Sequence, residues 1–330
     1  TVDENAAGAG RRLRPQRKHR RGAPKPFPRP AQKLRADPPP HPTQAGLFYK
    51  LKAASGDRFE NEVRFFERVG EASSSSPPDP IAGHTPRYFG VVEREGQQYL
   101  KMGSVTEGFE RPHLLDIKMG VRCYTEEETT KTKLRKDLYE RLITMGESHH
   151  LTDVEKEQKA ITKSRWMELR DAMSSTTTLG FRIDAVLTPS GHKTAFKSNL
   201  FRVHDPSEVV VELRAFLPTL AACAAAGNGA HPRAIAARFV ELLGALDADL
   251  RASAVFGAHE FIGSTLFFVA DANGGAGVWM IDFGITRVGP EGGLQHDVPW
   301  VLGNREDGYM IGLARLTAAW KSLCDDDEWL

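Results

Sequence analysis

Residues 112–120 read PHLLDIKMG, and this stretch decides how the rest of the chain is interpreted. The apolar run between the proline and the glycine predicts a strand. Because residues two apart on a strand point to the same face, the carboxylate of Asp116 and the ammonium of Lys118 are expected to lie side by side. Taken alone, such a pair is more typical of a surface ion pair than of a reaction centre.

A second polar group ends another apolar run. Residues 280–284 read MIDFG, so a predicted strand places the carboxylate of Asp282 at its end. A carboxylate in that position can hold a Mg²⁺ ion that bridges the phosphates of ATP. By itself this tripeptide is also weak evidence, because an acidic residue at a strand end usually belongs to a turn.

The chain before residue 112 is rich in strand patterns. We expect an amphipathic helix at 61–69, a strand at 47–51, and a hairpin made of strands at 88–93 and 97–102.

The chain after residue 124 changes character twice. Residues 126–173 are charged and helical in pattern, and Thr152 with Glu155 forms a predicted capping box. The elements expected after them are a strand at 180–186, two or three helices within 207–255, strands at 264–269 and 278–283 around a turn at 271–275, and a helix at 308–323. A strand-rich part, a helical insertion and a later mixed part indicate an α+β fold with two lobes.

Together, the two polar stretches resemble the signatures of the inositol polyphosphate kinase family. The match comprises the pattern PxxxDxKxG at 112–120, then GSTLFFV at 263–269 and IDFG at 281–284. Further similarity lies between these motifs, at residues 107–112, 119–122, 134–137, 179–183 and 303–309. These islands look most like the inositol 1,4,5-trisphosphate 3-kinase branch, and the resemblance covers roughly residues 45–323.

The resemblance implies an α+β, two-lobed inositol polyphosphate kinase fold, similar to protein kinases and SAICAR synthetase, with a helical inositol-binding insertion. We therefore expect three parts of the chain. They are a basic, Pro-rich, disordered tail at 1–44, a small β-rich N-lobe at 45–105, and a C-lobe at 106–330 that contains the insertion at about 124–174.

The resemblance also implies a reaction. Members of this branch use ATP and Mg²⁺ to phosphorylate the 3-hydroxyl of inositol 1,4,5-trisphosphate, which gives inositol 1,3,4,5-tetrakisphosphate and connects the enzyme to calcium signalling. Two alternatives stay open. One is a broader inositol polyphosphate multikinase, and the other is a catalytically weak regulator that binds inositol phosphates.

On the ATP side, the resemblance implies that a lysine of the small lobe contacts the ATP phosphates. Lys50 is the first candidate, and Lys52 on the same strand face is the second. The adenine hinge corresponds to Lys101, Met102, Gly103, Ser104 and Val105. The branch usually has an acidic residue in this hinge, and here Gly103 and Ser104 stand instead.

At the reaction centre, the resemblance places Asp116 near the ribose and the reacting phosphate. Lys118 is expected to face the substrate and the transferred phosphate. Asp282 is expected to hold Mg²⁺, with Ser264 as a second metal contact.

On the acceptor side, the resemblance points to the insertion. Arg135, Lys163, Trp166 and Arg170 are expected to bind the inositol phosphate, together with Lys118. Lys163 and Arg170 are seven residues apart, or two helical turns, so their side chains are expected on one helical face. Arginine and lysine are the side chains that pair with phosphate oxygens.

Two positions depart from the family pattern. Ile285 stands where the branch has a substrate-facing lysine, and Leu187 stands where it has a lysine on the ATP side. If the strand continues past Ile285, Arg287 is expected on the same face and replaces the first cation as a substrate contact. Lys193 is the candidate for the second. These losses are the reason why the functional alternatives stay open.

The composition sets broad limits. The chain has 330 residues, 40% hydrophobic and 26% charged, which argues against wholesale disorder and against a fibrous protein. Three distant cysteines form no CxxC pair, so a reducing compartment, the cytoplasm or the nucleus, is expected. The sequence suggests neither an apolar run of membrane-spanning length nor a secretory signal. His149 and His150 have no acidic or cysteine partner at an obvious metal spacing and are expected to be surface residues.

Charge is distributed unevenly along the chain. Residues 1–36 hold eleven basic and two acidic residues, whereas the remainder holds 33 basic and 41 acidic ones. Such a basic segment is expected to contact nucleic acid, anionic lipid or a nuclear import receptor, or to be a solvated tail without a partner. Its prolines exclude a continuous amphipathic helix, so no calmodulin site is expected. We expect a monomer.

Overall fold

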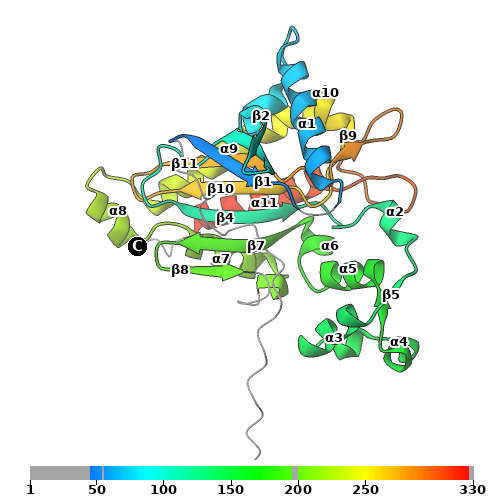
Figure 1. Cartoon of the computed structure of the whole chain (residues 1–330). Helices are drawn as coiled ribbons and strands as arrows, with labels where there is room; N and C mark the ends of the chain where they lie inside the picture. The colour runs from blue at the N-terminus through cyan, green and yellow to red at the C-terminus, as the bar shows by residue number, and fades with distance from the viewer. Residues whose placement is uncertain (1–44, 54–55, 195–199, 327–330) are drawn as a thin grey trace, which may run out of the picture. The chain divides into compact units, whose positions relative to one another are not determined.

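The computed structural model describes residues 45–53, 56–194 and 200–326, so the segment expected as a tail at 1–44 lies outside the described residues (Figure 1). The described strands form a three-stranded sheet, a five-stranded sheet and two short two-stranded ladders. Helices precede, connect and follow these strands, which agrees with the α+β class expected from the sequence.

The three-stranded sheet comes from the first part of the chain. Its strands are antiparallel, in the order β1-β3-β2, and their bounds are β1 (Leu47–Leu51), β2 (Tyr88–Arg94) and β3 (Gln97–Gly103). The hairpin of β2 and β3 confirms the predicted pair of strands. A short 3₁₀ helix, η1 (Pro80–His84), precedes β2.

Helix α1 (Arg58–Ser73) follows β1 and is amphipathic, as the sequence pattern predicts. Its buried side chains recur at helical spacing and are Phe59, Glu62, Phe65, Phe66 and Val69. Four of these five are apolar. A glutamate on an otherwise apolar face needs a partner, because burying an unpaired charge is costly.

The five-stranded sheet carries both polar stretches of the sequence. Its neighbouring strands are antiparallel, in the order β11-β10-β4-β7-β8. Their bounds are β4 (His113–Met119), β7 (Phe181–Thr188), β8 (Gly191–Thr194), β10 (Thr265–Ala270) and β11 (Ala276–Ile281). Strand β4 lies at the centre, which explains why nearly all its side chains are buried. Strand β11 ends at Ile281, so Asp282 follows the strand instead of belonging to it.

The later helices build the main core. They are α7 (Pro206–Phe216), α8 (Leu220–Ala226), α9 (Pro232–Ala252), α10 (Ala254–Gly257) and α11 (Tyr309–Asp325). Helices α9 and α11 pack against each other and against the sheet (Figure 1). The Trp320 ring of α11 lies 4.8 Å from the Phe239 ring of α9 and 5.7 Å from the Phe268 ring of β10, which joins both helices to the sheet.

The sequence suggested no apolar run of membrane-spanning length, and residues 206–226 show that this prediction is wrong. This stretch is apolar and long enough to cross a membrane by length and composition, with a mean hydropathy of 1.7. The structure divides it at residues 217–219 into α7, with 11 residues, and α8, with 7 residues. A bilayer requires about 20 helical residues, so neither helix spans it alone.

The helical insertion forms a separate apolar cluster. Its elements are α2 (Glu126–Thr129), β5 (Leu134–Arg135), α3 (Lys136–Thr144), η2 (Ser148–His150), α4 (Asp153–Gln158), β6 (Ile161–Thr162), α5 (Lys163–Ala172) and α6 (Thr176–Leu179). Figure 1 shows α3, α4 and α5 grouped together, away from α9 and α11. Leu142, Trp166 and Met167 lie in this second cluster. The predicted capping box of Thr152 and Glu155 is confirmed at the start of α4.

A buried ion pair fixes the long loop before α11. The Nδ1 atom of His296 lies 2.9 and 3.0 Å from the two carboxylate oxygens of Asp307, and both side chains are buried. Asp307 also accepts the backbone N–H groups of Phe261 and Tyr309. Burial lowers the pKa of His296, but the Asp307 carboxylate outweighs burial, so the pKa is raised.

We expect this ion pair to make stability depend on pH. A histidine with a raised folded-state pKa contributes stability below its unfolded pKa of about 6.5, and this contribution is lost as the pH rises through the raised value. The difference in unfolding free energy between wild type and His296→Gln should therefore shrink as the pH rises above about 6.5. Urea titrations at several pH values measure this difference. A constant or growing difference contradicts a charged imidazole at this position.

Candidate active site

The register of the five-stranded sheet brings the two polar stretches together. Lys118 of β4 pairs directly with Thr265 of β10, and Thr265 pairs with Ile281 of β11. Asp282 follows Ile281, so it lies at the same end of these three strands as Lys118 and Thr265. Asp116 lies two residues before Lys118, and both side chains are buried.

Four polar side chains at this end of the sheet form one hydrogen-bonded cluster, namely Asp116, Lys118, Thr265 and Asp282. The Nζ atom of Lys118 lies 3.0 Å from Asp116 Oδ1 and 3.0 Å from Asp282 Oδ2, and it also donates to Thr265 Oγ1. The Thr265 hydroxyl lies 3.1 Å from Asp116 Oδ1. The predicted adjacency of Asp116 and Lys118 is therefore seen, and Lys118 connects this pair to Asp282.

The small sheet contributes a second lysine to the cluster. The Nζ atom of Lys50, on β1, lies 2.9 Å from Asp282 Oδ1 and 2.6 Å from Glu62 Oε2. The Glu62 carboxylate also accepts the backbone N–H of Phe283. Lys52, the alternative candidate, pairs with Glu60 instead. The geometry therefore favours Lys50 as the phosphate-binding lysine.

The backbone around Asp282 orients its carboxylate. Asp282 has a φ of +67°, a left-handed conformation in which asparagine and aspartate are enriched among residues other than glycine. The next residue, Phe283, is fully buried, with its ring 4.1 Å from the Phe65 ring of α1. Asn61 of α1 donates to the backbone oxygen of Gly284. Helix α1 therefore fixes the position of the whole tripeptide.

Both lysines carry their charge at neutral pH. Burial lowers the pKa of Lys50, but the carboxylates of Asp282 and Glu62 outweigh it and raise the pKa above its usual value. Burial also lowers the pKa of Lys118, and the Asp116 and Asp282 carboxylates again raise it. The cluster is thus a set of fixed charges that are already arranged in the folded chain.

The donor atoms of the cluster fit a magnesium ion. Mg²⁺ prefers hard oxygen ligands and usually binds one or two carboxylates together with substrate phosphates. Asp282 and Asp116 supply carboxylate oxygens, and Thr265 supplies a hydroxyl. The two lysines supply positive charge for phosphate groups beside the metal.

The sequence analysis did not identify Thr265 and Glu62, and it expected Ser264 where the structure places Thr265. Ser264, expected at the metal, is buried, and its hydroxyl has no hydrogen-bond partner among the described residues. The hydroxyl of the neighbouring Thr265 faces the cluster instead, because adjacent residues of a strand point to opposite faces. Glu62 was also missed, although a glutamate on the apolar face of a helix is a visible signal in the sequence.

The expected adenine hinge lies at the end of β3. Met102 is buried, and the Lys101 side chain extends over the Phe89 ring at 5.7 Å. The N–H groups of Gly103 and Ser104 donate to the backbone oxygens of Arg87 and Gly46. These two donors are used inside the protein, so Val105 and the hinge carbonyl oxygens are the better candidates for holding adenine.

The expected acceptor cations lie around helix α5. Lys163 pairs with Glu128, and Arg170 donates to the Cys123 sulfur, so both side chains point toward the segment that follows β4. The shared face predicted from their spacing stays a prediction, which these two contacts support. Arg135 lies at the start of α3 on the surface, where it pairs with Asp137 at 2.5 Å.

Trp166 does not fit its expected role. Its side chain is only 5% exposed and belongs to the apolar cluster of the insertion. The Arg141 guanidinium lies 5.0 Å from the centre of its ring. The indole therefore supports the insertion from inside, and the expectation that it contacts the substrate directly is wrong for this conformation.

The replacements expected for the two missing lysines are also not seen. The chain leaves β11 at Ile281 and turns, so the strand period that would align Arg287 with Ile285 does not apply. Arg287 begins β12 (Arg287–Val288), which pairs with β9 (His259–Glu260), and its guanidinium lies 2.8 Å from Glu127. Lys193 pairs with Glu212 of α7 at 2.8 Å and is exposed.

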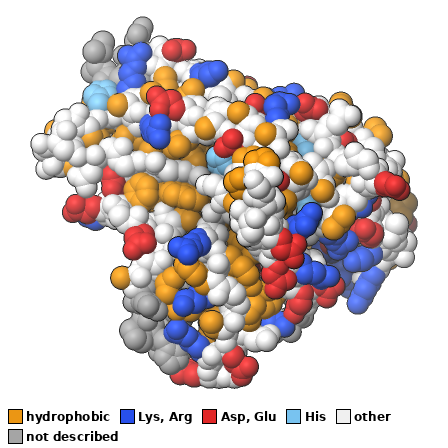
Figure 2. All heavy atoms as spheres, turned by 90° about the horizontal axis from the view of Figure 1, so that it is seen from above, with side chains coloured by type: hydrophobic (Ala, Val, Ile, Leu, Met, Phe, Trp, Pro, Cys, Tyr) orange, Lys and Arg blue, Asp and Glu red, His pale blue; other side chains and the backbone are white. Residues whose placement is uncertain are grey.

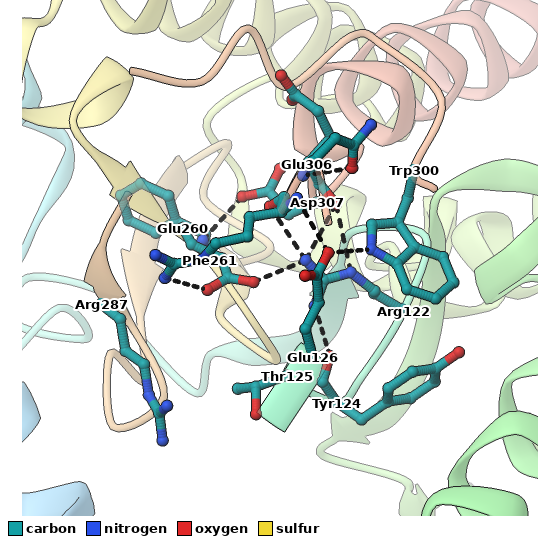
Figure 3. A network of polar contacts seen from close by, with 12 residues as sticks. Arg122, Tyr124, Thr125, Glu126, Glu260, Phe261, Arg287, Trp300, Glu306 and Asp307 are labelled. Atoms are coloured by element: carbon teal, nitrogen blue, oxygen red, sulfur yellow. Dashed lines mark hydrogen bonds and ion pairs between the residues drawn. The ribbon is translucent and has the colours of Figure 1, made fainter. Parts of the chain in front are cut away.

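Helix α2 holds three segments through three successive glutamates. Glu126 accepts hydrogen bonds from the Trp300 indole and from two backbone N–H groups of the loop at 303–305 (Figure 3). Glu127 pairs with Arg287, and Glu128 with Lys163. Burial raises the pKa of the Glu126 and Glu128 carboxyl groups, but these partners outweigh it and both pKa values are lowered. Figure 2, which shows the molecule from above relative to Figure 1, likewise has acidic and basic side chains next to one another on its surface.

The arrangement around Asp282 defines a class of protein. A strand lysine that pairs with a helix glutamate and faces the aspartate of Asp-Phe-Gly is the arrangement with which protein kinases hold ATP and its metal ions. The site is thus that of a kinase-like phosphotransferase. A family model described as inositol polyphosphate kinase matches residues 99–321, and the chain belongs to the inositol polyphosphate kinase family.

Named relatives agree with this family. The chain is 40% identical to human inositol-trisphosphate 3-kinase A over 253 residues, which are 75% of this chain and 51% of that protein. It is 39% identical to human inositol-trisphosphate 3-kinase B over 283 residues, 82% of this chain and 27% of that protein. The Caenorhabditis elegans inositol-trisphosphate 3-kinase homolog is 31% identical over 264 residues, 78% of this chain and 50% of that protein. The chain spans about half or less of these relatives.

A solved structure shares the fold. The inositol phosphate multikinase Ipk2 from S. cerevisiae, in complex with ADP and Mn²⁺, matches with a TM-score of 0.52 and 16% identity, over 84% of this chain and 99% of that chain. At this identity the likeness concerns the fold alone. It confirms the α+β inositol polyphosphate kinase fold expected from the sequence.

Proposed function

We propose that this chain is an ATP- and Mg²⁺-dependent kinase that phosphorylates the 3-hydroxyl of inositol 1,4,5-trisphosphate. The observation that carries the proposal is the cluster of Lys50, Lys118, Asp116 and Asp282 between the small sheet and the end of the large sheet. The acceptor is taken from the inositol-trisphosphate 3-kinases to which the chain is about 40% identical.

Each residue of the cluster has a role in this reaction. Asp282 would hold the Mg²⁺ ion, which neutralises phosphate charge when bound, and Lys50 would position the ATP phosphates. Lys118 is placed to neutralise the charge on the transferred phosphoryl oxygens. Asp116 orients Lys118. It is not assigned as a general base, because a loose phosphoryl-transfer transition state asks little of one.

The acceptor would bind against the helical insertion. Lys163 and Arg170 contact the segment that follows β4, and β4 itself carries Lys118. A trisphosphate needs several cations, and these side chains supply them from one helix. In this proposal, Arg135 adds a charge from the start of α3.

Product identification tests the proposal. The tag-free chain is incubated with ATP, Mg²⁺ and inositol 1,4,5-trisphosphate, and the position of the new phosphate is determined. A single product phosphorylated at the 3-hydroxyl is expected. Phosphorylation of several inositol phosphates at different hydroxyls would favour a multikinase. Tight binding without turnover would favour the regulator that Ile285 and Leu187 leave open.

Arg135→Ala tests the acceptor side. A hydrogen bond to a charged group contributes about 1.5–3 kcal/mol, so the KM for the inositol phosphate should rise roughly ten- to a hundred-fold while the KM for ATP changes little. Arg135 is suited to this test because its partner in the structure is the neighbouring Asp137 on the surface. Lys156→Ala, an exposed cation of α4 paired with Asp153, is the matched control. Equal changes in both KM values would exclude the insertion as the acceptor site.

Glu128→Gln should have the opposite effect. The Glu128 carboxylate forms an ion pair with the Lys163 ammonium, so an acceptor phosphate that binds Lys163 has to displace this carboxylate. Removing the charge, at a site where an ion pair is worth about 0.2–1 kcal/mol, should lower the KM for the inositol phosphate by up to about five-fold. Glutamine keeps an acceptor for the Thr125 N–H that Glu128 binds. Exposed Glu157→Gln serves as the control, and an unchanged or higher KM would contradict a role for Lys163.

A further inference from the structure

Three potential metal ligands lie together at the turn between α3 and α4, outside the site described above. The Oε2 atom of Glu147 lies 3.7 Å from His149 Nε2 and 3.6 Å from His150 Nε2. The three ligand atoms all lie within 4.8 Å of one another. Both imidazole rings therefore present a nitrogen to the same carboxylate oxygen, a partner that the sequence reading of this histidine pair overlooked.

The separations fit a bound metal better than direct hydrogen bonds. At 3.6 and 3.7 Å the nitrogen and oxygen atoms are too far apart for a hydrogen bond of normal length. Zinc binds histidine nitrogen and carboxylate oxygen at about 2.0–2.2 Å, so two ligands of a tetrahedral zinc lie about 3.3–3.5 Å apart. A movement of a few tenths of an ångström would bring the carboxylate oxygen to that spacing from each imidazole nitrogen. The two imidazole nitrogens lie within 4.8 Å of each other, and their exposed rings can turn toward a shared ion.

Glu147 is held in place for such a role. Its side chain is 9% exposed, and its second oxygen, Oε1, pairs with Arg202 of η3 (Leu200–Arg202) at 2.5 Å. The backbone N–H of Glu147 donates to the backbone oxygen of Leu142, and the backbone oxygen of Glu147 accepts the N–H of His150. The arginine thus orients the carboxylate, as outer partners of metal ligands do. The two histidines are more exposed, at 67% and 36%, and can adjust to the ion.

We propose that Glu147, His149 and His150 form a binding site for a zinc ion, with water completing the coordination. Two imidazoles and one carboxylate suit zinc, whereas Mg²⁺ and Ca²⁺ prefer oxygen ligands. The site therefore differs in chemistry from the magnesium site proposed at Asp282. Through Arg202, the bound ion braces the end of α3 against η3, two segments that are distant in the sequence.

Calorimetric titration of the full, tag-free and zinc-free chain with Zn²⁺, in buffer that contains excess Mg²⁺, tests the proposal. Wild type is expected to show a saturable site with one equivalent of zinc and a rise in thermal midpoint on binding. His149→Ala and His150→Ala should each weaken this site at least ten-fold and lose the rise. His204→Ala, an exposed histidine before α7, should bind as wild type does.

Two controls keep the result decisive. The histidine variants change side chains that lie outside both apolar clusters, so their thermal midpoints without zinc should match that of wild type. Lost binding cannot then be ascribed to unfolding. Glu147→Gln is a supporting variant only, because it also weakens the pair with Arg202. No saturable zinc binding by wild type, or unchanged binding by both histidine variants, would overturn the proposal.

Discussion

Asp282→Asn is expected to abolish turnover and leave the fold intact. The substitution removes the carboxylate charge that meets both Lys50 and Lys118 and that would hold the metal ion. The loss of one electrostatic contact in an active site costs about 2.7–4 kcal/mol in the barrier, so kcat should fall at least about a hundred- to a thousand-fold. Steady-state rates with ATP, Mg²⁺ and inositol 1,4,5-trisphosphate measure this loss.

The fold should survive because the local structure tolerates asparagine. Asparagine is one of the few residues that readily adopts the φ of +67° found at position 282. Lys50 keeps Glu62, and Lys118 keeps Asp116, so neither lysine loses every partner. The thermal midpoint should therefore change little. Asp247→Asn, on the exposed face of α9, is the matched control, and substantial Mg²⁺-dependent activity of the Asp282 variant would remove Asp282 from the reaction.

Arg122→Met is expected to have the largest effect on stability. Arg122 is 2% exposed, pairs with Glu260 at 2.6 Å, and donates to the backbone oxygens of Tyr124, Arg305 and Glu306 (Figure 3). Breaking a buried pair costs about 3–5 kcal/mol, because the remaining charge stays buried without its partner. Arg305 still pairs with the other oxygen of Glu260, so we expect the lower end, about 3 kcal/mol.

Urea unfolding of the two proteins measures this change. Arg238→Met is the control, because Arg238 forms an exposed pair with Glu241 on α9 and should cost less than about 1 kcal/mol. A similar loss for both variants would mean that burial of Arg122 adds nothing. Because Arg122 lies directly after β4 and binds the loop before α11, its loss should also loosen the connection between these two segments.

The elements that could be predicted from the sequence are those whose signals are local. The strand at 113–119, the hairpin after residue 88 and the capping box of Thr152 each depend on residues within a few positions of one another. Their side-chain period or turn chemistry is therefore visible without any partner. The motif around Asp116 and Lys118 was found in the same way, and the family followed from several such motifs in order.

The sequence was less reliable where a role depended on strand direction or on a turn. Ser264 and Thr265 are neighbours, and only the pairing of Thr265 with Lys118 shows which hydroxyl faces the cluster. A shift of one residue in register would reverse them. Arg287 was placed by assuming a continuous strand, and the turn after Ile281 removed that basis.

Contacts between groups that are distant in the sequence depend on tertiary packing. Lys50 and Asp282 are 232 residues apart and come together because α1 buries Phe65 and Phe66 against Phe283. Glu62 enters the site by the same packing. Such contacts arise from apolar burial between distant segments, which is non-directional and leaves no spacing rule in the sequence. The sequence therefore determined the strands and the chemistry they carry, and packing of α1 on the large sheet decided how that chemistry is assembled.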